Sequence, residues 1–175
     1  LQVDGAGAGG HVAHAVRAAR RAGDLIVRNL DRVPTSSIQA KGRNDFVTEI
    51  DRMAERDIIE TVRRVHPDHG FLAEESGRSG GGDEFVWIID PIDGTKNFIR
   101  QIPLFGTQIA LMYKNKLITG VSSMPAMREL LFADQGAAFL NDKPVRVRDI
   151  ADLSKAAISF AGLNRLPGYV KPQSM

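Results

Sequence analysis

The sequence contains no cysteine, almost no net charge and no long apolar run, and each absence excludes a class of protein. Among the 175 residues there is no cysteine, which excludes disulfide bonds and thiolate metal sites and fits a reducing compartment. The net charge of +2 is too small to indicate a nucleic-acid partner. No apolar run approaches the roughly 18 residues of a membrane-spanning helix, and the first residues lack the apolar segment of a signal peptide. We therefore expect a cytoplasmic protein with no membrane partner.

The most informative stretch is WIIDPIDGTKNF, at residues 87–98. The apolar residues 85–89 predict a buried strand that ends at Asp90, because Pro91 has no N–H and is expected to force the chain out of the sheet. Asp90 and Asp93 then flank a tight turn. Two carboxylates at that range favour a divalent cation such as Mg²⁺ between them. Glycine at 94 lets the backbone approach a ligand. The backbone amides of Gly94 and Thr95 are therefore candidate hydrogen-bond donors to a bound phosphate.

Hydrophobic periodicity predicts two helices in the first part of the chain. Apolar residues recur at helical spacing over residues 11–30. A second helix is predicted to begin at Thr48, a suitable N-cap residue, and to end near Val65. Residues 41–47, before it, are predicted to form a turn or short hairpin, and the glycine-rich residues 1–10 a flexible leader.

Short apolar runs separated by turn residues predict a series of strands in the rest of the chain. A strand at 71–73 is followed by a flexible loop at 76–84 and then by the strand that ends at Asp90. Strands joined by tight turns pair as antiparallel neighbours. We therefore expect an α+β fold, with two helices packed on a largely antiparallel β-sheet. The further predicted strands are, in chain order, 106–113, 117–123, 129–133, 137–140, 144–147 and 157–160.

His11 and His14 have the spacing of half a metal site. No further ligand lies near them in the sequence, so we expect both to be surface histidines. The arginines of the same predicted helix form a basic face, for which exposure to solvent is the default expectation.

Three segments resemble the signature motifs of one family. Residues 90–98, DPIDGTKNF, are similar to the D-P-I-D-G-T-x-N-F motif of the inositol monophosphatase family. Residues 71–77, FLAEESG, resemble the acidic pair that ends the preceding strand in that family, and residues 41–51, KGRNDFVTEID, resemble its K-x-x-x-D-x-V-T-x-x-D segment. The three occur in the family's order and spacing, and the resemblance covers roughly residues 11 to 160.

The resemblance implies a Mg²⁺-dependent, Li⁺-sensitive phosphatase that uses two or three Mg²⁺ ions, with Mn²⁺ as a substitute. Glu74, Asp90 and the carbonyl of Ile92 match the positions that hold the first ion. Asp90 and Asp93 match those that hold the second. Of the adjacent acids at 74 and 75, the family position is that of Glu74, and only one of the two can point inward from a strand.

The same resemblance implies roles in catalysis and substrate binding. Asp51 and Thr95 match the pair that orients the attacking water and takes its proton, and Glu74 also counts among the catalytic residues. Asp93, Gly94 and Thr95 match the positions that bind the substrate. The implied substrate is a small phosphorylated molecule, the implied assembly is a homodimer, and a nucleic-acid partner is not expected.

The resemblance leaves the function open between three alternatives. The first is hydrolysis of inositol monophosphate. The second is the same chemistry on another phosphomonoester, because residues 103–107 and 122–126 resemble histidinol-phosphate phosphatases of this family. The third is a non-catalytic role as an RNA or transcription accessory protein, with the arginine-rich first helix as its site.

The length also carries an expectation. Family members are longer and have a second α/β half, whose W-D-x-A-type motif supplies one more metal-binding aspartate. This chain has a single tryptophan, Trp87, and no such motif. We expect a leader at 1–10, the N-terminal α+β half of an αβαβα sandwich at 11–150, and the start of a truncated C-terminal domain at 151–175. We expect these 175 residues alone to be a poor phosphatase.

Overall fold

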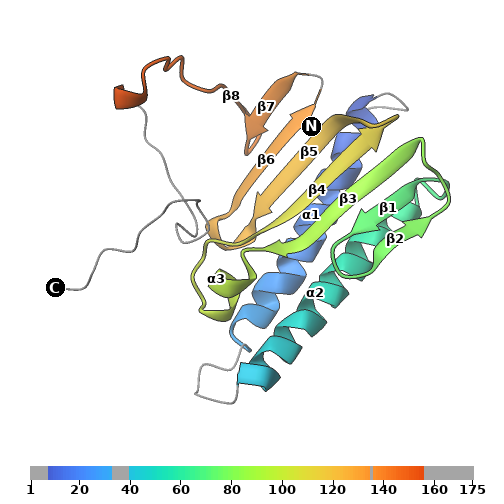
Figure 1. The fold of residues 1–175 in the computed structure, drawn as a ribbon, viewed down its shortest axis with the longest axis vertical. Helices are drawn as coiled ribbons and strands as arrows, with labels where there is room; N and C mark the ends of the chain where they lie inside the picture. Colours follow the sequence, from blue (N-terminus) through green and yellow to red (C-terminus); the bar gives the residue numbers. More distant parts are fainter. Residues whose placement is uncertain (1–7, 33–39, 135, 156–175) are drawn as a thin grey trace, which may run out of the picture. The chain divides into compact units, whose positions relative to one another are not determined.

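The computed structural model describes residues 8–32, 40–134 and 136–155. Residues up to Val145 belong to one compact unit, which holds the helices and the sheet (Figure 1). Residues 146–155 belong to a second unit, with one short 3₁₀ turn, η2 (Leu153–Lys155). Residues 1–7 of the predicted leader and the strand predicted at 157–160 lie outside the described residues. Among the described residues, no helix is both long enough and apolar enough to cross a membrane.

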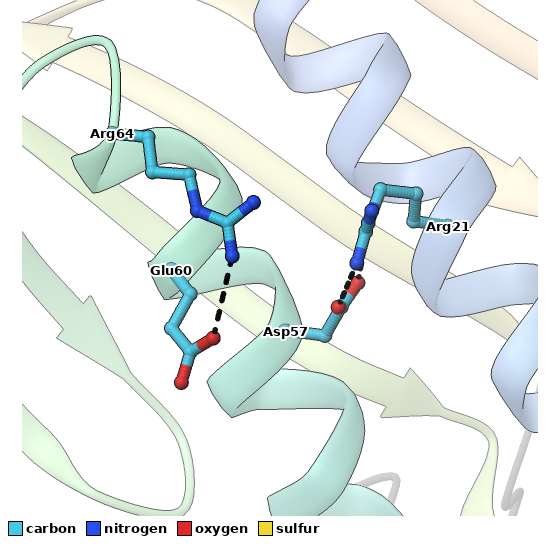
Figure 2. Close-up of polar contacts among 4 residues, drawn as sticks. All are labelled: Arg21, Asp57, Glu60 and Arg64. Atoms are coloured by element: carbon cyan, nitrogen blue, oxygen red, sulfur yellow. Dashed lines mark hydrogen bonds and ion pairs between the residues drawn. The ribbon is translucent and has the colours of Figure 1, made fainter.

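Two long helices, α1 (Ala8–Leu30) and α2 (Ala40–Arg63), lie side by side on one face of the sheet (Figure 1). Small side chains let α1 come close to its neighbours, and at Gly23 an added Cβ would lie 3.0 Å from Pro125 Cβ. Figure 2 shows the ion pair that joins the two helices, in which Arg21 Nη2 lies 2.6 Å from Asp57 Oδ1. The fully buried alanines of α1 are Ala15, Ala18, Ala19 and Ala22.

The sheet has eight strands in the order β2-β1-β3-β4-β5-β6-β7-β8. Strand β1 pairs with β3 in parallel, and the other neighbours pair antiparallel. The predicted α+β class, with helices on a largely antiparallel sheet, is confirmed. The strands are β1 (Gly70–Ala73), β2 (Gly77–Gly80), β3 (Phe85–Asp93), β4 (Gly106–Tyr113), β5 (Lys116–Met124), β6 (Glu129–Asp134), β7 (Ala137–Leu140) and β8 (Lys143–Val145).

The largest buried side chains lie between the two long helices and the sheet. Trp87 and Phe71, from β3 and β1, are fully buried, and so are Ile26 of α1 and Ile58 of α2. Burial of such side chains is the main favourable term in folding, on the order of 1.5–3 kcal/mol each. The core therefore fixes α2 above the ends of β1 and β3, where the predicted site residues lie.

The prediction that the chain leaves the sheet at Pro91 is wrong. Strand β3 continues to Asp93, with a shift in its register against β4 between Asp90 and Asp93. Proline is tolerated there because the last β1 partner is Ala73, opposite Ile89, so no β1 ladder bond is needed at Pro91. The Thr107 hydroxyl donates to the Pro91 carbonyl oxygen, 2.9 Å away, and holds the bulge against β4.

Three other predicted segments are also wrong. Helix α2 begins at Ala40, so residues 41–47 are helical rather than a hairpin, and Thr48 lies inside the helix rather than at its N-cap. Once a helix is anchored by packing, each added turn costs little, because nucleation is the expensive step. Residues 77–80, predicted as flexible loop, form the edge strand β2 against β1. Helix α1 begins at Ala8, so residues 8–10 of the predicted leader are helical.

Candidate active site

Parallel pairing of β1 and β3 brings two acidic residues to one edge of the sheet. Ala73 lies opposite Ile89 at the end of the β1–β3 ladder. The next residues along, Glu74 and Asp90, therefore lie just beyond that ladder at the same place. The Glu74 amide donates to the Ile89 carbonyl oxygen, 3.1 Å away, which extends the pairing by one bond. Glu74 is, after burial, the largest cause that raises the pKa of Asp90.

Asp90 is half-buried and in an unfavourable environment for a negative charge. Burial raises its pKa to about 7, and the hydrogen bond and charge of Glu74 and the charge of Asp93 add to the effect. Its Oδ1 atom is buried and has no hydrogen-bond partner among the described residues. A buried carboxylate oxygen without a partner is costly, so this atom fits a cation ligand.

Asp51 reaches the same cluster from α2. Its side chain is 6% exposed, and burial, followed by the charges of Glu75, Glu74, Asp90 and Glu55, raises its pKa to about 7. Acids from α2, from the end of β1 and from β3 therefore repel one another electrostatically. A bound divalent cation would relieve that repulsion, because carboxylate and carbonyl oxygens are the donors that Mg²⁺ prefers.

The turn after β3 is fixed by its backbone. Gly94 has a φ of +89°, and an added Cβ would lie 2.9 Å from the Leu104 carbonyl oxygen, so only glycine fits without strain. A short helix, α3 (Thr95–Ile99), follows directly. The Asn97 side-chain amide donates to the same Leu104 carbonyl oxygen at 2.7 Å and keeps that loop against the turn.

The hydroxyl of Thr95 points back to the preceding strand. It donates to the Ile92 carbonyl oxygen at 3.1 Å. A carbonyl oxygen has two lone pairs, so Ile92 can accept this bond and still face a cation. Asp93 is exposed and accepts a hydrogen bond from Gln108 Nε2 at 3.3 Å.

Glu55 is a site residue that the sequence reasoning missed. It is 2% exposed, and its two carboxylate oxygens accept the amide hydrogens of Glu75 and Ser76 at 2.8 and 3.0 Å. The turn after β1 is thereby tied to α2, which fixes where Glu74 lies. A signal was present, since Glu55 follows Asp51 by four residues and therefore shares its face of the helix.

A pocket of about 420 Å³ borders Asp90 on the sheet and extends across β3 to β7. Its lining is mostly apolar, with Ile88, Leu131 and Phe139 among the contributing residues, and Asp90 is its one carboxylate. An apolar hollow of this kind suits a nonpolar side chain better than a phosphate. The acidic cluster, rather than this pocket, is therefore the candidate site.

The structure brings Asp51, Glu74, Asp90 and Asp93 into one electrostatically coupled group. Gly94, Thr95 and the Ile92 carbonyl, which were predicted to bind phosphate or metal, form the turn directly after Asp93.

Comparison with known proteins gives a consistent result. A sequence profile described as the inositol monophosphatase family matches residues 11–165. The chain is 40% identical over 148 residues to the Nus factor SuhB of Pseudomonas aeruginosa, covering 82% of this chain and 55% of that protein. The chain thus spans about half the length of the curated relatives it matches.

Solved structures agree with the sequence matches. The extragenic suppressor protein suhB of Bartonella henselae superposes with a TM-score of 0.70 at 35% identity, over 81% of this chain and 55% of that one. The inositol monophosphatase of Anabaena (Nostoc) sp. PCC 7120 also gives a TM-score of 0.70 at 35% identity, over 82% and 51%.

Proposed function

The chain belongs to the inositol monophosphatase family, and on that premise we propose that the protein is a Mg²⁺-dependent phosphatase that hydrolyses inositol monophosphate to inositol and phosphate. The observation that carries the proposal is the coupled group of carboxyls at the ends of β1 and β3, in which a buried oxygen of Asp90 has no partner among the described residues. Such a group is stable as a set of anions only with a cation.

Glu74, Asp90, Asp93 and the Ile92 carbonyl are the groups that would hold Mg²⁺, with Mn²⁺ as a substitute. All four offer hard oxygen donors. When bound, the ion would acidify a water molecule and neutralise charge on the phosphate. Glu55 supports this set from behind, because it fixes the turn that carries Glu74 through two amide hydrogen bonds.

Thr95 and Asp51 would prepare the attacking water. Because Thr95 gives its hydroxyl hydrogen to the Ile92 carbonyl, the lone pairs of Oγ1 remain free to accept a hydrogen from water. Asp51 would take the proton, because its buried carboxyl reaches the same cluster from α2 and a positioned carboxylate can act as a general base. The amides of Gly94 and Thr95 would hold the phosphate, because glycine keeps that backbone unobstructed.

Phosphate release from a panel of monoesters tests the proposal. The full-length protein is assayed with inositol monophosphate, histidinol phosphate and glycerol phosphate in Mg²⁺, with and without Li⁺. We expect the highest kcat/KM for inositol monophosphate, inhibition by Li⁺, and loss of activity in Asp90→Asn. A preference for histidinol phosphate would select the alternative substrate, and Mg²⁺-independent activity would reject the metal mechanism.

The names of the relatives favour a second candidate, an accessory role in transcription. The curated relatives at 40–44% identity are named Nus factor SuhB. Binding of the purified protein to a transcription complex, measured for the wild type and for Asp90→Asn, separates the two functions. Binding that survives in a variant without phosphatase activity would show an independent role, and absence of binding would remove this candidate.

Family resemblance also underlies our proposals of a homodimer and of a cytoplasmic location. Light scattering of the purified protein tests the first, and fractionation of cells tests the second. A monomeric mass, or recovery in the membrane fraction, would contradict the respective proposal.

A further inference from the structure

The four histidines of the sequence come together at one place in the structure. His11 and His14 lie on α1, whereas His66 and His69 lie between the end of α2 and the start of β1. The expectation that His11 and His14 are surface histidines is wrong, because both are half-buried and have other histidines beside them. Their partners lie more than fifty residues away in the chain, as the contact between His14 and His66 shows, so no local spacing could reveal them.

Three of the histidines have the geometry of a metal site. One ring nitrogen from each of His11, His66 and His69 lies within 4.8 Å of the others. The His66 and His69 rings stack with centroids 4.5 Å apart, and the His11 centroid is 4.9 Å from that of His66. Three nitrogen donors at this separation can reach one ion with bonds of about 2.0–2.1 Å after small side-chain shifts.

The fourth histidine supports the group from one side. His14 Nδ1 and His66 Nε2 are 2.9 Å apart, a hydrogen-bond distance. If His66 donates this bond, its Nδ1 lone pair is free for a metal, and His14 fixes the ring as an outer partner. This is the arrangement usually found around metal-binding histidines, in which the second ring nitrogen is hydrogen-bonded.

The surroundings hold the histidines in the form that binds metals. Burial lowers the pKa of each of the four imidazoles, and that of His66 falls to about 4. Neutral imidazole is the ligating form. His11 Nδ1 and Asp134 Oδ1 are both buried without a hydrogen-bond partner among the described residues, and the charge of Asp134 acts on His11. A cation at this place would face a nearby anion.

We propose that His11, His66 and His69 form a binding site for a divalent transition-metal ion of the Zn²⁺, Ni²⁺ and Co²⁺ class, separate from the acidic site. Imidazole suits these ions, whereas Mg²⁺ prefers oxygen donors, so the two sites differ in chemistry. The ion would link the start of α1 to the segment before β1. It would thereby stabilise the fold, as does any ligand that binds only the native state.

Trp87 supplies an internal reporter for this site. Its indole Nε1–H donates to His69 Nδ1 at 3.0 Å, and its ring centroid lies 5.9 Å from that of His66. A metal on His69 must either replace the indole at Nδ1 or bind Nε2 after the ring proton has moved to Nδ1, which can then no longer accept from the indole. Both change the surroundings of Trp87. The chain has one tryptophan, so its fluorescence reports on this place alone.

The test is titration of the purified protein with ZnCl₂, followed by Trp87 fluorescence and calorimetry, with Mg²⁺ present in excess to fill the acidic site. We expect one Zn²⁺ per chain, a changed Trp87 emission and a higher Tm. His66→Gln should weaken Zn²⁺ binding by more than about 100-fold, and His14→Gln, which removes an outer partner, by about 10–100-fold. Asp90→Asn is the matched control and should bind Zn²⁺ as the wild type does.

Several results would overturn the proposal. These are absence of Zn²⁺ binding, equal binding by the wild type and His66→Gln, or loss of binding in Asp90→Asn, which would place Zn²⁺ in the acidic site. Should the histidine variants fail to fold, Co²⁺ absorption of the wild type decides. Intense visible bands of a four-coordinate site with nitrogen ligands support the site, and the weak spectrum of octahedral Co²⁺ rejects it.

Discussion

The Thr95 hydroxyl donates a hydrogen bond to the carbonyl oxygen of Ile92, 3.1 Å away, across the turn that ends β3. This bond joins a group proposed to orient water with a group proposed to hold metal. It also fixes the direction of the threonine side chain, because the hydroxyl hydrogen is committed to the carbonyl. The two proposed roles therefore depend on one local geometry. A substitution at Thr95 can remove the first role and leave the second.

In the complete enzyme, Thr95→Ala should lower kcat by about 100-fold or more while leaving Mg²⁺ affinity nearly unchanged, because the alanine removes an acid–base partner but no metal-binding oxygen. Steady-state kinetics and Mg²⁺ calorimetry measure the two effects. Thr95→Ser, which keeps the hydroxyl, is the matched control and should retain most of kcat. A wild-type kcat in Thr95→Ala would rule out its role in catalysis.

Asp90→Asn should remove most Mg²⁺ and Mn²⁺ binding, because the variant lacks the central charge of the acidic group. Asp24→Asn is the control, since it changes the net charge equally at an exposed position on α1. Calorimetry should show binding for the wild type and for Asp24→Asn. The loss of affinity in Asp90→Asn should exceed about 100-fold, the upper end for a lost outer partner, because Asp90 is itself a proposed ligand. Equal metal affinity in all three proteins would show that the metal binds elsewhere than at Asp90.

Asp51→Asn should stabilise the metal-free protein, and more so at high pH. The pKa of Asp51 rises from 3.8 to about 7 in the folded state, so between these values the folded state holds a proton that the unfolded state has lost. Wild-type stability from this group is therefore present at low pH and is lost as pH rises through about 7. Asparagine is neutral throughout and avoids that loss.

Thermal unfolding in EDTA, at pH 5 and at pH 8, measures this effect. The Tm of Asp51→Asn minus that of the wild type should be larger at pH 8, by on the order of 2–4 °C for each kcal/mol of repulsion removed. Comparing variant with wild type cancels the opposite pH dependence of the histidines, whose lowered pKa values favour folding at higher pH. A difference in Tm that does not change with pH would contradict the raised pKa of Asp51.

Gly94→Ala should destabilise the protein more than Gly77→Ala does. Both glycines have positive φ, +89° and +71°, so alanine is strained by about 1 kcal/mol at either position. At Gly77 an added Cβ meets no atom within 4 Å, whereas at Gly94 it lies 2.9 Å from the Leu104 carbonyl oxygen. Displacing that backbone should cost about a further 1–3 kcal/mol, measured by urea unfolding. Equal losses of stability in the two variants would show that the loop at Leu104 moves aside at little cost.

Elements dominated by local signals were predictable from the sequence. The periodicity of α1 and the tight turns of the strand meander follow from residues near one another, as at Lys114 and Asn115, whose positive φ values of 45° and 63° form the turn between β4 and β5. The residues of the acidic site could be named because three short segments, 41–51, 71–77 and 90–98, each resemble a family motif. The roles of these residues stay predictions.

Features that depend on partners elsewhere in the chain were not predictable. Strand β2 has no apolar side chain and forms because its backbone can pair with that of β1. Pro91 is tolerated in β3 because of where β1 ends, and Glu55 gains its role from two amides twenty residues away. The histidine group depends on the docking of α1 against the end of α2. Each of these is set by tertiary pairing, which local propensity does not encode.

The strand order also has a consequence for how the protein folds. Strands β3 to β8 pair in chain order, and the acidic site is built from one continuous stretch, α2 to α3, so its loops close at low entropic cost. Helix α1 packs against its sequence neighbour α2 and also against β5 and β6, which lie far from it in the sequence, and such long-range contacts are slow to form. We expect substitutions where Gly23 meets Pro125 to accelerate unfolding and leave the folding rate almost unchanged, whereas substitutions between β3 and β4 should slow folding. The carboxylates would then come together before α1 packs against β5 and β6.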